Sequence, residues 1–188
     1  MSLVDRVLDT IFFTQERVGL DGKTFTIYKF RTMERGKENE RAALLEIQGR
    51  DKFGYIIDDP RITFFGGYLR MFWIDELPQI MNFLKRDMNL IGPRPLMPED
   101  YEELPPDLKE KRKKVRPGLI PVTYVDYFSI KSDEDRWESE RGYFNKREKN
   151  PQLTDLWYLA RAFTTITKIA KSNFTIEMYK WTNSYPYL

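Results

Sequence analysis

Residues 72–95 read FWIDELPQIMNFLKRDMNLIGPRP, and they place two adjacent acids, Asp75 and Glu76, in an otherwise apolar run. Pro78 follows two positions after the pair and suits the first turn of a helix, where its missing N–H is not needed. The apolar residues that come next predict a short helix over 76–86. Its apolar face is predicted to consist of Leu77, Ile80, Met81 and Leu84.

The two acids are predicted to lie at the N-terminus of this helix, with Asp75 as the N-cap residue. Unpaired N–H groups and the helix dipole favour negative charge there, and they would favour a phosphate group at the same place. A plain capping role for the pair is the simplest interpretation. The apolar flanks make a poor setting for a solvated cap, however, and Arg70 and Arg94 bracket the pair in the sequence. Arginines that fork onto phosphates are the expected neighbours of phosphoryl chemistry.

Phosphoryl chemistry gives two adjacent carboxylates different tasks. One carboxylate can attack phosphorus while its neighbour holds Mg²⁺, which takes hard oxygen ligands and bridges to phosphates. This division of tasks needs no histidine. We therefore interpret Asp75 and Glu76 as a candidate catalytic dyad that acts on one pyrophosphate.

The composition of the chain restricts the chemistry that it can carry out. Its 188 residues are 41% hydrophobic, which is enough for one well-buried core and predicts a single domain. Histidine and cysteine are both absent, so His-based triads, disulfides, thiolate nucleophiles and metal sites built from these residues are excluded. No apolar run approaches the ~20 residues of a membrane-spanning helix, and no N-terminal signal pattern is visible. The chain is therefore predicted to be intracellular.

The charge of the chain is balanced, with 31 basic against 29 acidic residues, but one run is strongly basic. Residues 109–116 contain six lysines and arginines. A solvated helix face and a face turned toward anionic lipid headgroups are the two main interpretations of this run. A nucleic-acid patch is the weakest interpretation, because no aromatic residues are interleaved, and no nucleic-acid partner is expected.

The rest of the sequence predicts a mixed α/β fold, of the α+β type, that is rich in helix and contains a short β-hairpin. Residues 11–33 are predicted to form a strand, a turn and a second strand. Residues 34–50 are predicted to be a helix or a mobile loop, and Gly66 with Gly67 is predicted to break the chain. Residues 118–130 are predicted to be a buried strand or irregular core.

The C-terminal part is predicted to begin with a helix over 153–170, because apolar positions recur there with a helical period. These positions are 153, 156, 157, 160, 163, 166 and 169. Core packing is the main interpretation of this stripe, and contact with a membrane interface is the alternative. From Phe174 the chain is polar with scattered aromatics, which suit a headgroup boundary, internal packing or contacts in a homo-oligomer. The aromatics in question are Trp181, Tyr185 and Tyr187.

Several motifs in a fixed order resemble the bacterial sugar transferase family, the monotopic polyprenol-phosphate phosphoglycosyl transferases. The motifs are FFTQERVGLDGKTFTIYKFRTM (12–33), DPRIT (59–63) followed by LR (69–70), DELPQ (75–79), KRDMNLIGPRP (85–95) and RPG (116–118). The resemblance runs from about residue 11 to residue 119, and more weakly through the helix at 153–170. One DELPQ alone would be weak evidence, but the ordered set is specific.

The resemblance implies a reaction. The family transfers a sugar 1-phosphate from a UDP-sugar to a polyprenyl phosphate and releases UMP, as the first step of cell-surface glycan assembly. It implies that Asp75 is the nucleophile, forming a phosphosugar-aspartyl intermediate, and that Glu76 helps to hold Mg²⁺, or Mn²⁺ in its place. The substrate contacts that it implies are Lys29, Arg31, Arg70, Arg94 and Arg116. Asp87 and Asn89 are expected to have structural roles.

The same resemblance implies that residues 1–188 form a single catalytic domain. The motif-bearing core is expected at 11–119, and the C-terminal helix and aromatic tail at 153–188. Family members carry out this reaction in the cytoplasm, at the inner face of the bacterial cell membrane. That location, and contact with an anionic membrane surface, are therefore expected for this chain.

The sequence departs from the family pattern in two places. Only about ten residues precede the first motif, so the membrane-penetrating hairpin of the family is expected to be missing, and residual membrane affinity is expected to be electrostatic. After RPG, Tyr124 stands where the family usually has a glutamine, so the sugar is not assigned. The alternative function is a non-catalytic UDP-sugar-binding or assembly protein derived from this family.

Overall fold

The N-terminal hairpin forms as the sequence predicts. The structure is a computed structural model that describes residues 9–51 and 55–184, apart from the side chains of Glu38 and of 173–184. β1 (Phe12–Val18) pairs antiparallel with β2 (Thr24–Phe30), and a 3₁₀ turn, η1 (Leu20–Gly22), connects them.

The register of the hairpin pairs a polar or basic side chain with an apolar one at each position of one face. The directly opposed pairs on this face are Phe13–Lys29, Gln15–Ile27 and Arg17–Phe25. Successive side chains of a strand alternate between its two faces. Arg17 of β1 and Lys29 of β2 therefore project to the same side of the hairpin, and this side becomes one wall of the cavity described below.

The second sheet consists of two short parallel strands, β3 (Asn89–Gly92) and β4 (Gly118–Pro121). The strands approach closely at their glycines: a Cβ on Gly118 would lie 2.0 Å from the backbone nitrogen of Gly92. No larger residue fits at this crossing without moving the backbone. β4 leads into a largely buried 3₁₀ segment, η4 (Val122–Asp126), so the prediction for this part of the chain is confirmed.

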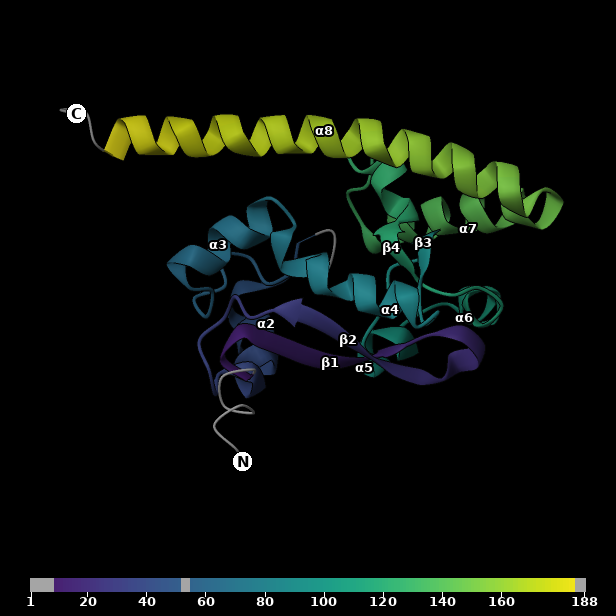
Figure 1. Cartoon of the computed structure of the whole chain (residues 1–188), viewed down its shortest axis with the longest axis horizontal. Helices are drawn as coiled ribbons and strands as arrows, with labels where there is room; N and C mark the ends of the chain where they lie inside the picture. Colours follow the sequence, from purple (N-terminus) through teal and green to yellow (C-terminus); the bar gives the residue numbers. More distant parts are fainter. Residues whose placement is uncertain (1–8, 52–54, 185–188) are drawn as a thin grey trace.

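Helices surround the two sheets. They are α2 (Arg41–Gln48), α3 (Phe64–Met71), α4 (Ile80–Leu84), α5 (Pro98–Glu102), α6 (Pro106–Lys113), α7 (Asp133–Lys149) and α8 (Pro151–Ser184). Two further 3₁₀ segments are η2 (Glu38–Glu40) and η3 (Ile74–Gln79). In Figure 1, α8 runs along one side of the molecule, the hairpin lies on the opposite side, and α3 and α4 lie between them. The chain forms one compact mixed α/β domain rich in helix, which confirms the predicted fold class.

The main hydrophobic core lies where α6, α7, α8 and η4 meet, around side chains such as Tyr143 and Ala162. A buried ion pair joins two of these helices. Arg112 of α6 donates two hydrogen bonds to the Glu140 carboxylate of α7, at 2.8 and 2.5 Å. Both side chains are almost completely buried.

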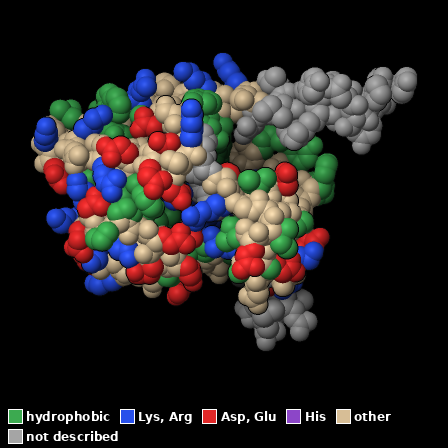
Figure 2. Space-filling model, turned by 180° about the vertical axis from the view of Figure 1, so that it is seen from behind, with side chains coloured by type: hydrophobic (Ala, Val, Ile, Leu, Met, Phe, Trp, Pro, Cys, Tyr) green, Lys and Arg blue, Asp and Glu red, His purple; other side chains and the backbone are tan. Residues whose placement is uncertain are grey.

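The basic run of residues 109–116 is already paired over much of its length. Three of its lysines form ion pairs with glutamates: Lys109 with Glu102, Lys111 with Glu148, and Lys113 with Glu110. Figure 2 shows acidic and basic side chains intermixed over the part of the molecule that contains α6 and α7. Together with the burial of Arg112, this makes the run neither a uniformly solvated face nor a separate cationic patch.

Gly66 and Gly67 lie inside α3 rather than breaking the chain, so this prediction is wrong. Thr63 caps the helix, because its hydroxyl accepts a hydrogen bond from the Gly66 N–H at 3.0 Å. A Cβ on Gly66 would lie 2.1 Å from the carbonyl oxygen of Thr32. The glycine is therefore required by the close packing of α3 on the chain that follows β2, not by a turn.

The segment predicted as a helix over 76–86 buries polar side chains and exposes apolar ones, so it is inverted relative to an ordinary amphipathic helix. It consists of η3 followed by α4, and its buried side chains are polar: Asp75, Gln79 and Asn82 are 7%, 3% and 0% exposed. Its apolar side chains point outward. Leu77, Ile80, Met81 and Leu84 are 63%, 54%, 48% and 67% exposed. The predicted apolar face exists, but it does not pack into the core.

Asn82 holds the inverted segment against the hairpin. Its side-chain carbonyl accepts from the Tyr28 N–H at 3.3 Å, and its amide donates to the Thr26 carbonyl at 2.7 Å. The same amide also donates to the Asp87 carboxylate at 3.3 Å. Asn89 begins β3 and is paired there through its backbone. These contacts agree with the structural roles expected for Asp87 and Asn89.

The apolar stripe predicted to pack α8 into the core is mostly exposed. Leu153, Leu156, Trp157 and Phe163 are between 46% and 66% exposed. The helix instead buries Thr154, Tyr158, Ala162, Thr165 and Ile169. Thr165 can be buried because its hydroxyl donates to the Arg161 carbonyl at 3.2 Å. The core-packing interpretation is therefore wrong for most of the stripe, and the tail aromatics Trp181, Tyr185 and Tyr187 lie outside the described side chains.

Candidate active site

A cavity of about 440 Å³ lies beside the hairpin and is also lined by α3, η3 and the loop after β3. This is within the usual range of ligand pockets, roughly 300–1,000 Å³. Its wall carries side chains of opposite charge. The sequence-predicted site residues that line it are Lys29, Arg31, Arg70, Asp75, Glu76 and Arg94. The structure therefore brings together residues from four separate motifs.

A turn at Trp73 directs the two acids into the cavity. Trp73 has a positive φ of 55° and is the N-cap residue of η3. This backbone conformation is uncommon for a bulky residue. The indole N–H of Trp73 donates to the Tyr124 hydroxyl at 3.1 Å, which fixes the turn. Asp75 and Glu76 lie in the first turn of η3, so the prediction that Asp75 is itself the N-cap is wrong.

Glu76 is held by an ion pair with the hairpin. Its carboxylate lies 2.6 Å from the Lys29 ammonium, and both side chains are about five-sixths buried, with 15% and 16% exposed. Burial alone would raise the pKa of Glu76. The positive charges of Lys29 and Arg94 outweigh that effect, so the pKa of Glu76 lies below its ordinary value and the carboxylate is ionised.

Asp75 is in a different electrostatic environment from its neighbour. Burial raises the pKa of Asp75 above its ordinary value, the charge of Lys29 opposes this, and the nearby Glu76 carboxylate adds to it. Asp75 is a buried carboxylate whose negative charge is only partly compensated. Poorly solvated carboxylates of this kind are the more reactive ones.

Arg70 reaches the cavity from α3. Its Nε donates to the Thr32 hydroxyl at 2.8 Å. Thr32 is the residue whose carbonyl Gly66 approaches, so the close packing of α3 and the position of Arg70 have the same origin. Arg70 has no carboxylate at ion-pair distance among the residues that the structure describes.

Arg94 is held from two sides. Its guanidinium donates to the Tyr55 hydroxyl at 2.5 Å and lies 4.8 Å from the centre of the Tyr55 ring. Its backbone carbonyl accepts a hydrogen bond from Arg112 at 2.9 Å. The buried Arg112–Glu140 pair of the core therefore also positions the loop that carries Arg94.

Two predicted substrate contacts differ from the rest. Arg31 lines the cavity, but it also forms an ion pair with Asp9 at 3.0 Å. Arg116 is half-buried and is not among the residues that line the cavity. A substrate-binding role for Arg116 stays a prediction that the arrangement of side chains does not support.

Two kinds of residue that line the cavity were not predicted from the sequence. One is Arg17, whose position on the same strand face as Gln15 follows from the period of a strand. The other is the aromatic pair Tyr55 and Trp73, which lines the cavity beside Tyr124, the position already noted as a departure from the family pattern. No local pattern distinguishes these aromatics, because segments far apart in the sequence bring them together.

The acidic side chains offer only part of a metal site. Among residues 9–51 and 55–184, no group of three or more acidic side chains could by itself hold a metal ion. Mg²⁺ often uses only one or two carboxylates and takes its other ligands from phosphates and water. Asp75 and Glu76 both line the cavity and fit a Mg²⁺ that enters with a diphosphate, provided that Lys29 releases Glu76.

Comparison with known proteins identifies the family. The model of the bacterial sugar transferase family matches residues 3–169. The chain therefore belongs to the bacterial sugar transferase family. Within the described ranges, none of the helices combines the length and the apolar character needed to cross a membrane.

Three curated relatives illustrate the similarity. The uncharacterized sugar transferase EpsL of Bacillus subtilis (strain 168) is 38% identical over 134 residues, which are 71% of this chain and 59% of that protein. A putative undecaprenyl-phosphate N-acetylgalactosaminyl 1-phosphate transferase of the same strain is 45% identical over 86 residues, 46% of this chain and 42% of that protein. The UDP-glucose:undecaprenyl-phosphate glucose-1-phosphate transferase of Escherichia coli (strain K12) is 32% identical over 152 residues, 79% of this chain and 28% of that protein. The chain thus spans less than two thirds of the length of each relative.

Proposed function

We propose that this chain is a phosphoglycosyl transferase that moves a sugar 1-phosphate from a UDP-sugar to a polyprenyl phosphate. In the first step an oxygen of Asp75 attacks the sugar-bearing phosphorus of the donor. The bond from that phosphorus to the bridging oxygen breaks, and UMP departs with the oxygen and its electron pair. In the second step a phosphate oxygen of the polyprenyl phosphate attacks the aspartyl phosphosugar, which releases Asp75 and forms a polyprenyl diphosphosugar.

One observation carries this proposal: Asp75 is a buried, incompletely compensated carboxylate on the wall of a cavity rich in cations. Arg70 and Lys29 act on its charge, and Arg94 lies farther along the same wall. Such cations can stabilise the charge of a transferring phosphoryl group. A covalent intermediate also suits a site that receives a nucleotide donor and a lipid acceptor in turn. The names of relatives that act on undecaprenyl phosphate support this acceptor class.

Mg²⁺, or Mn²⁺ in its place, is the proposed cofactor, and Glu76 is its main protein ligand. When bound, the ion would neutralise charge on the diphosphate. The protein's own contribution is to keep Glu76 ionised, through Lys29 and Arg94, at the pH where the reaction occurs. Glu76 has to give up its ion pair with Lys29 in order to bind the metal. We therefore expect the metal to bind weakly until a diphosphate is present.

The proposed location is the inner face of the bacterial cell membrane, reached through an apolar surface rather than the basic run. This apolar surface is formed by α3, η3 and α4, and each member is at least 38% exposed. Its members are Phe64, Phe65, Tyr68, Phe72, Ile74, Leu77, Ile80, Met81, Phe83 and Leu84. A group of large, exposed apolar side chains on consecutive elements is typical of an interaction site. Because Leu77 directly follows Glu76, a lipid acceptor could reach the cavity from this surface.

The test is donor turnover with a direct search for the intermediate. The protein is incubated with a panel of UDP-sugars, Mg²⁺ and a short-chain polyprenyl phosphate, and release of UMP is measured. With a UDP-sugar alone, the peptide that carries Asp75 should gain the mass of a sugar phosphate. Binding of a UDP-sugar without UMP release, in the presence of lipid and metal, would instead support the alternative of a non-catalytic binding or assembly protein. A label on Glu76 would reverse the two carboxylate roles.

A further inference from the structure

Arg17 lies in the cavity wall without an acidic partner. Its guanidinium donates to the Gln15 side-chain oxygen at 2.5 Å and, over a long 3.4 Å, to the Pro95 carbonyl. Its Nε is buried and has no hydrogen-bond partner. No carboxylate of the described residues lies at ion-pair distance from it. A buried charged donor that is left unpaired is costly in a folded protein.

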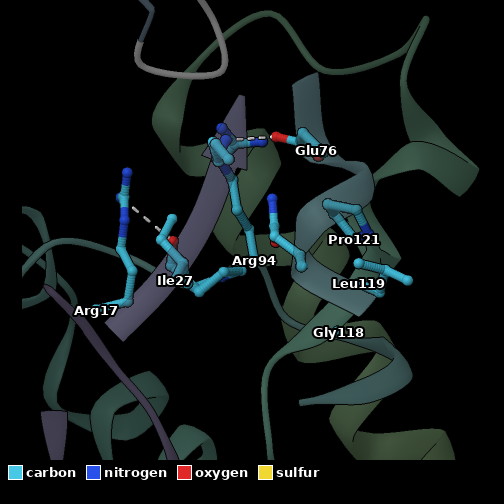
Figure 3. Close-up of a pocket in the computed structure, with 10 residues that line it drawn as sticks. Arg17, Ile27, Glu76, Arg94, Gly118, Leu119 and Pro121 are labelled. Atoms are coloured by element: carbon cyan, nitrogen blue, oxygen red, sulfur yellow. Dashed lines mark hydrogen bonds and ion pairs between the residues drawn. The ribbon is translucent and has the colours of Figure 1, made fainter. Parts of the chain in front are cut away.

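A second cation makes this arrangement more costly. Arg17 and Arg94 both line the cavity, and they also line a small hollow together with Lys29 and Glu76. In Figure 3, Arg94 lies between Arg17 and Glu76 around this hollow. Burial, and next the charge of Arg94, lower the pKa of Arg17 to about 10, so the guanidinium remains protonated at neutral pH. Two adjacent cations of this kind are stable together when an anion joins them.

The cations of the cavity divide between the two carboxylates. Lys29 and Arg70 are the cations that act on Asp75. Lys29, Arg94 and Arg17 have the largest effect among the cations on Glu76, and all three line the small hollow with Glu76, whereas Asp75 and Arg70 do not. Lys29 therefore acts on both carboxylates. Arg70 lies on the side of Asp75, and Arg17 and Arg94 lie on the side of Glu76.

We propose that Arg17 is a substrate-binding residue which, together with Arg94, holds the phosphate that departs with the nucleotide. This inference rests on the proposed function. In phosphoryl transfer the attacking and leaving oxygens lie on opposite sides of the phosphorus. Because Asp75 attacks the sugar-bearing phosphate, the departing phosphate lies farther from Asp75. The cations on that side are Arg17 and Arg94.

The chemical consequence is charge stabilisation in the first step. When the bond between phosphorus and the bridging oxygen breaks, negative charge develops on the phosphate of UMP. The planar guanidinium groups of Arg17 and Arg94 can each donate two parallel hydrogen bonds to that phosphate. No proton has to be supplied, because UMP departs as an anion that these two cations compensate.

A purely structural role for Arg17 predicts a different behaviour. In that case Arg17 would only join β1 to the loop at Pro95, and its loss would disturb every ligand of the cavity alike. A phosphate-binding role affects only ligands that carry the phosphate. The comparison of UMP with uridine separates the two roles, because the two ligands differ by that phosphate alone.

The experiment measures binding of UMP and of uridine to the full chain by calorimetry, without added metal. We expect Arg17→Gln to weaken UMP binding about 10- to 100-fold, as for loss of a charge-assisted contact. Uridine binding should be unchanged. Arg17→Lys should restore part of the UMP affinity, because it keeps the charge but not the forked geometry. Lys23→Gln, which removes a charge from a side chain that is 82% exposed, is the matched control.

Each outcome is decisive. An equal loss of UMP and uridine affinity in a folded Arg17→Lys protein, or no loss of UMP affinity in Arg17→Gln, overturns the inference and leaves the proposed function intact. If the wild-type protein binds UMP but releases none from any UDP-sugar, the proposed function fails, and the assignment of Arg17 to the departing phosphate fails with it. Arg17 would then be only an anion contact.

Discussion

Three arginines of the α6–α7 region and three of the arginines that line the cavity are used in opposite ways. In the α6–α7 region each of three arginines forms at least two hydrogen bonds to one carboxylate. These pairs are Arg112–Glu140, Arg141–Asp107 and Arg147–Asp155. Eight arginines line the cavity, and five of them form ion pairs: Arg31, Arg41, Arg50, Arg61 and Arg136. The other three, Arg17, Arg70 and Arg94, have no carboxylate at ion-pair distance among the described residues.

The difference shows that the unpaired charges are not a general property of this chain. With 29 acidic residues, the chain has enough carboxylates to pair its arginines. Where stability is required, it does so with forked geometry. Three of the eight arginines that line the cavity, Arg17, Arg70 and Arg94, are not paired in this way, and the proposed function leaves their hydrogen-bonding capacity for an anionic ligand. A site arranged in this way sacrifices stability for binding, as functional sites commonly do.

The largest expected effect concerns the cavity and follows from replacing Asp75, the proposed nucleophile. Asp75→Asn keeps the shape of the side chain but removes the attacking charge, so UMP release should fall on the order of 10⁴-fold. Because the folded state raises the pKa of Asp75, ionised Asp75 costs stability at neutral pH, and the variant should melt no lower than the wild type. Initial rates and thermal unfolding measure the two effects. Substantial turnover by a folded Asp75→Asn protein would contradict the assignment.

The next largest effect concerns the stability provided by the ion-paired arginines of the α6–α7 region. Glu140→Ala leaves the Arg112 charge buried without a partner, so the free energy of unfolding should fall by about 3–5 kcal/mol. Asp107→Ala, in the more exposed pair with Arg141, should lower the free energy of unfolding far less, because water and salt screen a surface ion pair. Arg17→Gln should not destabilise the protein, because it relieves repulsion with Arg94. Urea titrations compare the three variants, and a large loss of stability in Arg17→Gln would remove the contrast between the two regions.

A third effect concerns the apolar surface beside the cavity. Phe64 and Phe65 are 74% and 78% exposed. Replacing both with aspartate should lower partition onto anionic vesicles about 10- to 100-fold, because at an interface each aromatic side chain gains only about half of the roughly 1.5–3 kcal/mol of full burial. Ile47→Asp on α2, where Ile47 is 79% exposed, is the matched control.

Salt distinguishes this docking from an electrostatic one. Wild-type binding through the apolar surface should survive high salt, because screening weakens charge interactions and not apolar burial. Co-sedimentation with vesicles at low and high salt measures this. Binding that disappears at high salt would restore the electrostatic interpretation of residues 109–116.

The smallest effect is a shift of the pH profile. Asp75 must be ionised to attack, so the donor half-reaction should decline as the pH falls through its raised pKa, above the range of an ordinary aspartate. Glu76, with its lowered pKa, should stay ionised through that decline. Lys29→Met removes a charge that lowers the pKa of both carboxylates, so the decline should move to higher pH. An unchanged profile in Lys29→Met would show that Asp75 does not control it.

The sequence predicts the parts of this molecule in which local pattern and fold agree. The hairpin follows from its alternation and turn glycines. The meeting of Lys29, Arg70, Asp75 and Glu76 follows from the family motifs. The exposed sides of α4 and α8 could not be predicted, because hydrophobic periodicity gives the apolar face of a helix and not what that face contacts. Asn82 and Thr165 are buried instead, since long-range and local hydrogen bonds satisfy their polar atoms.

Gly66 and Arg112 illustrate a second limit. Gly66 resembles a chain break, but its lack of a side chain serves a contact with Thr32 far away in the sequence. Arg112 belongs to a run that reads as solvated, but its partner Glu140 lies on another helix. Both positions are determined by a single distant neighbour, which no local window contains.

The exposure of Leu77, directly after Glu76, has a kinetic consequence. On the proposed membrane surface, the donor would arrive from water in three dimensions and the acceptor from the bilayer in two. The rate of the second step would then depend on the mole fraction of acceptor in the lipid, and adding plain lipid at constant acceptor would slow the reaction by surface dilution. The protein would respond to how crowded the bilayer is with acceptor rather than to how much acceptor the whole sample contains.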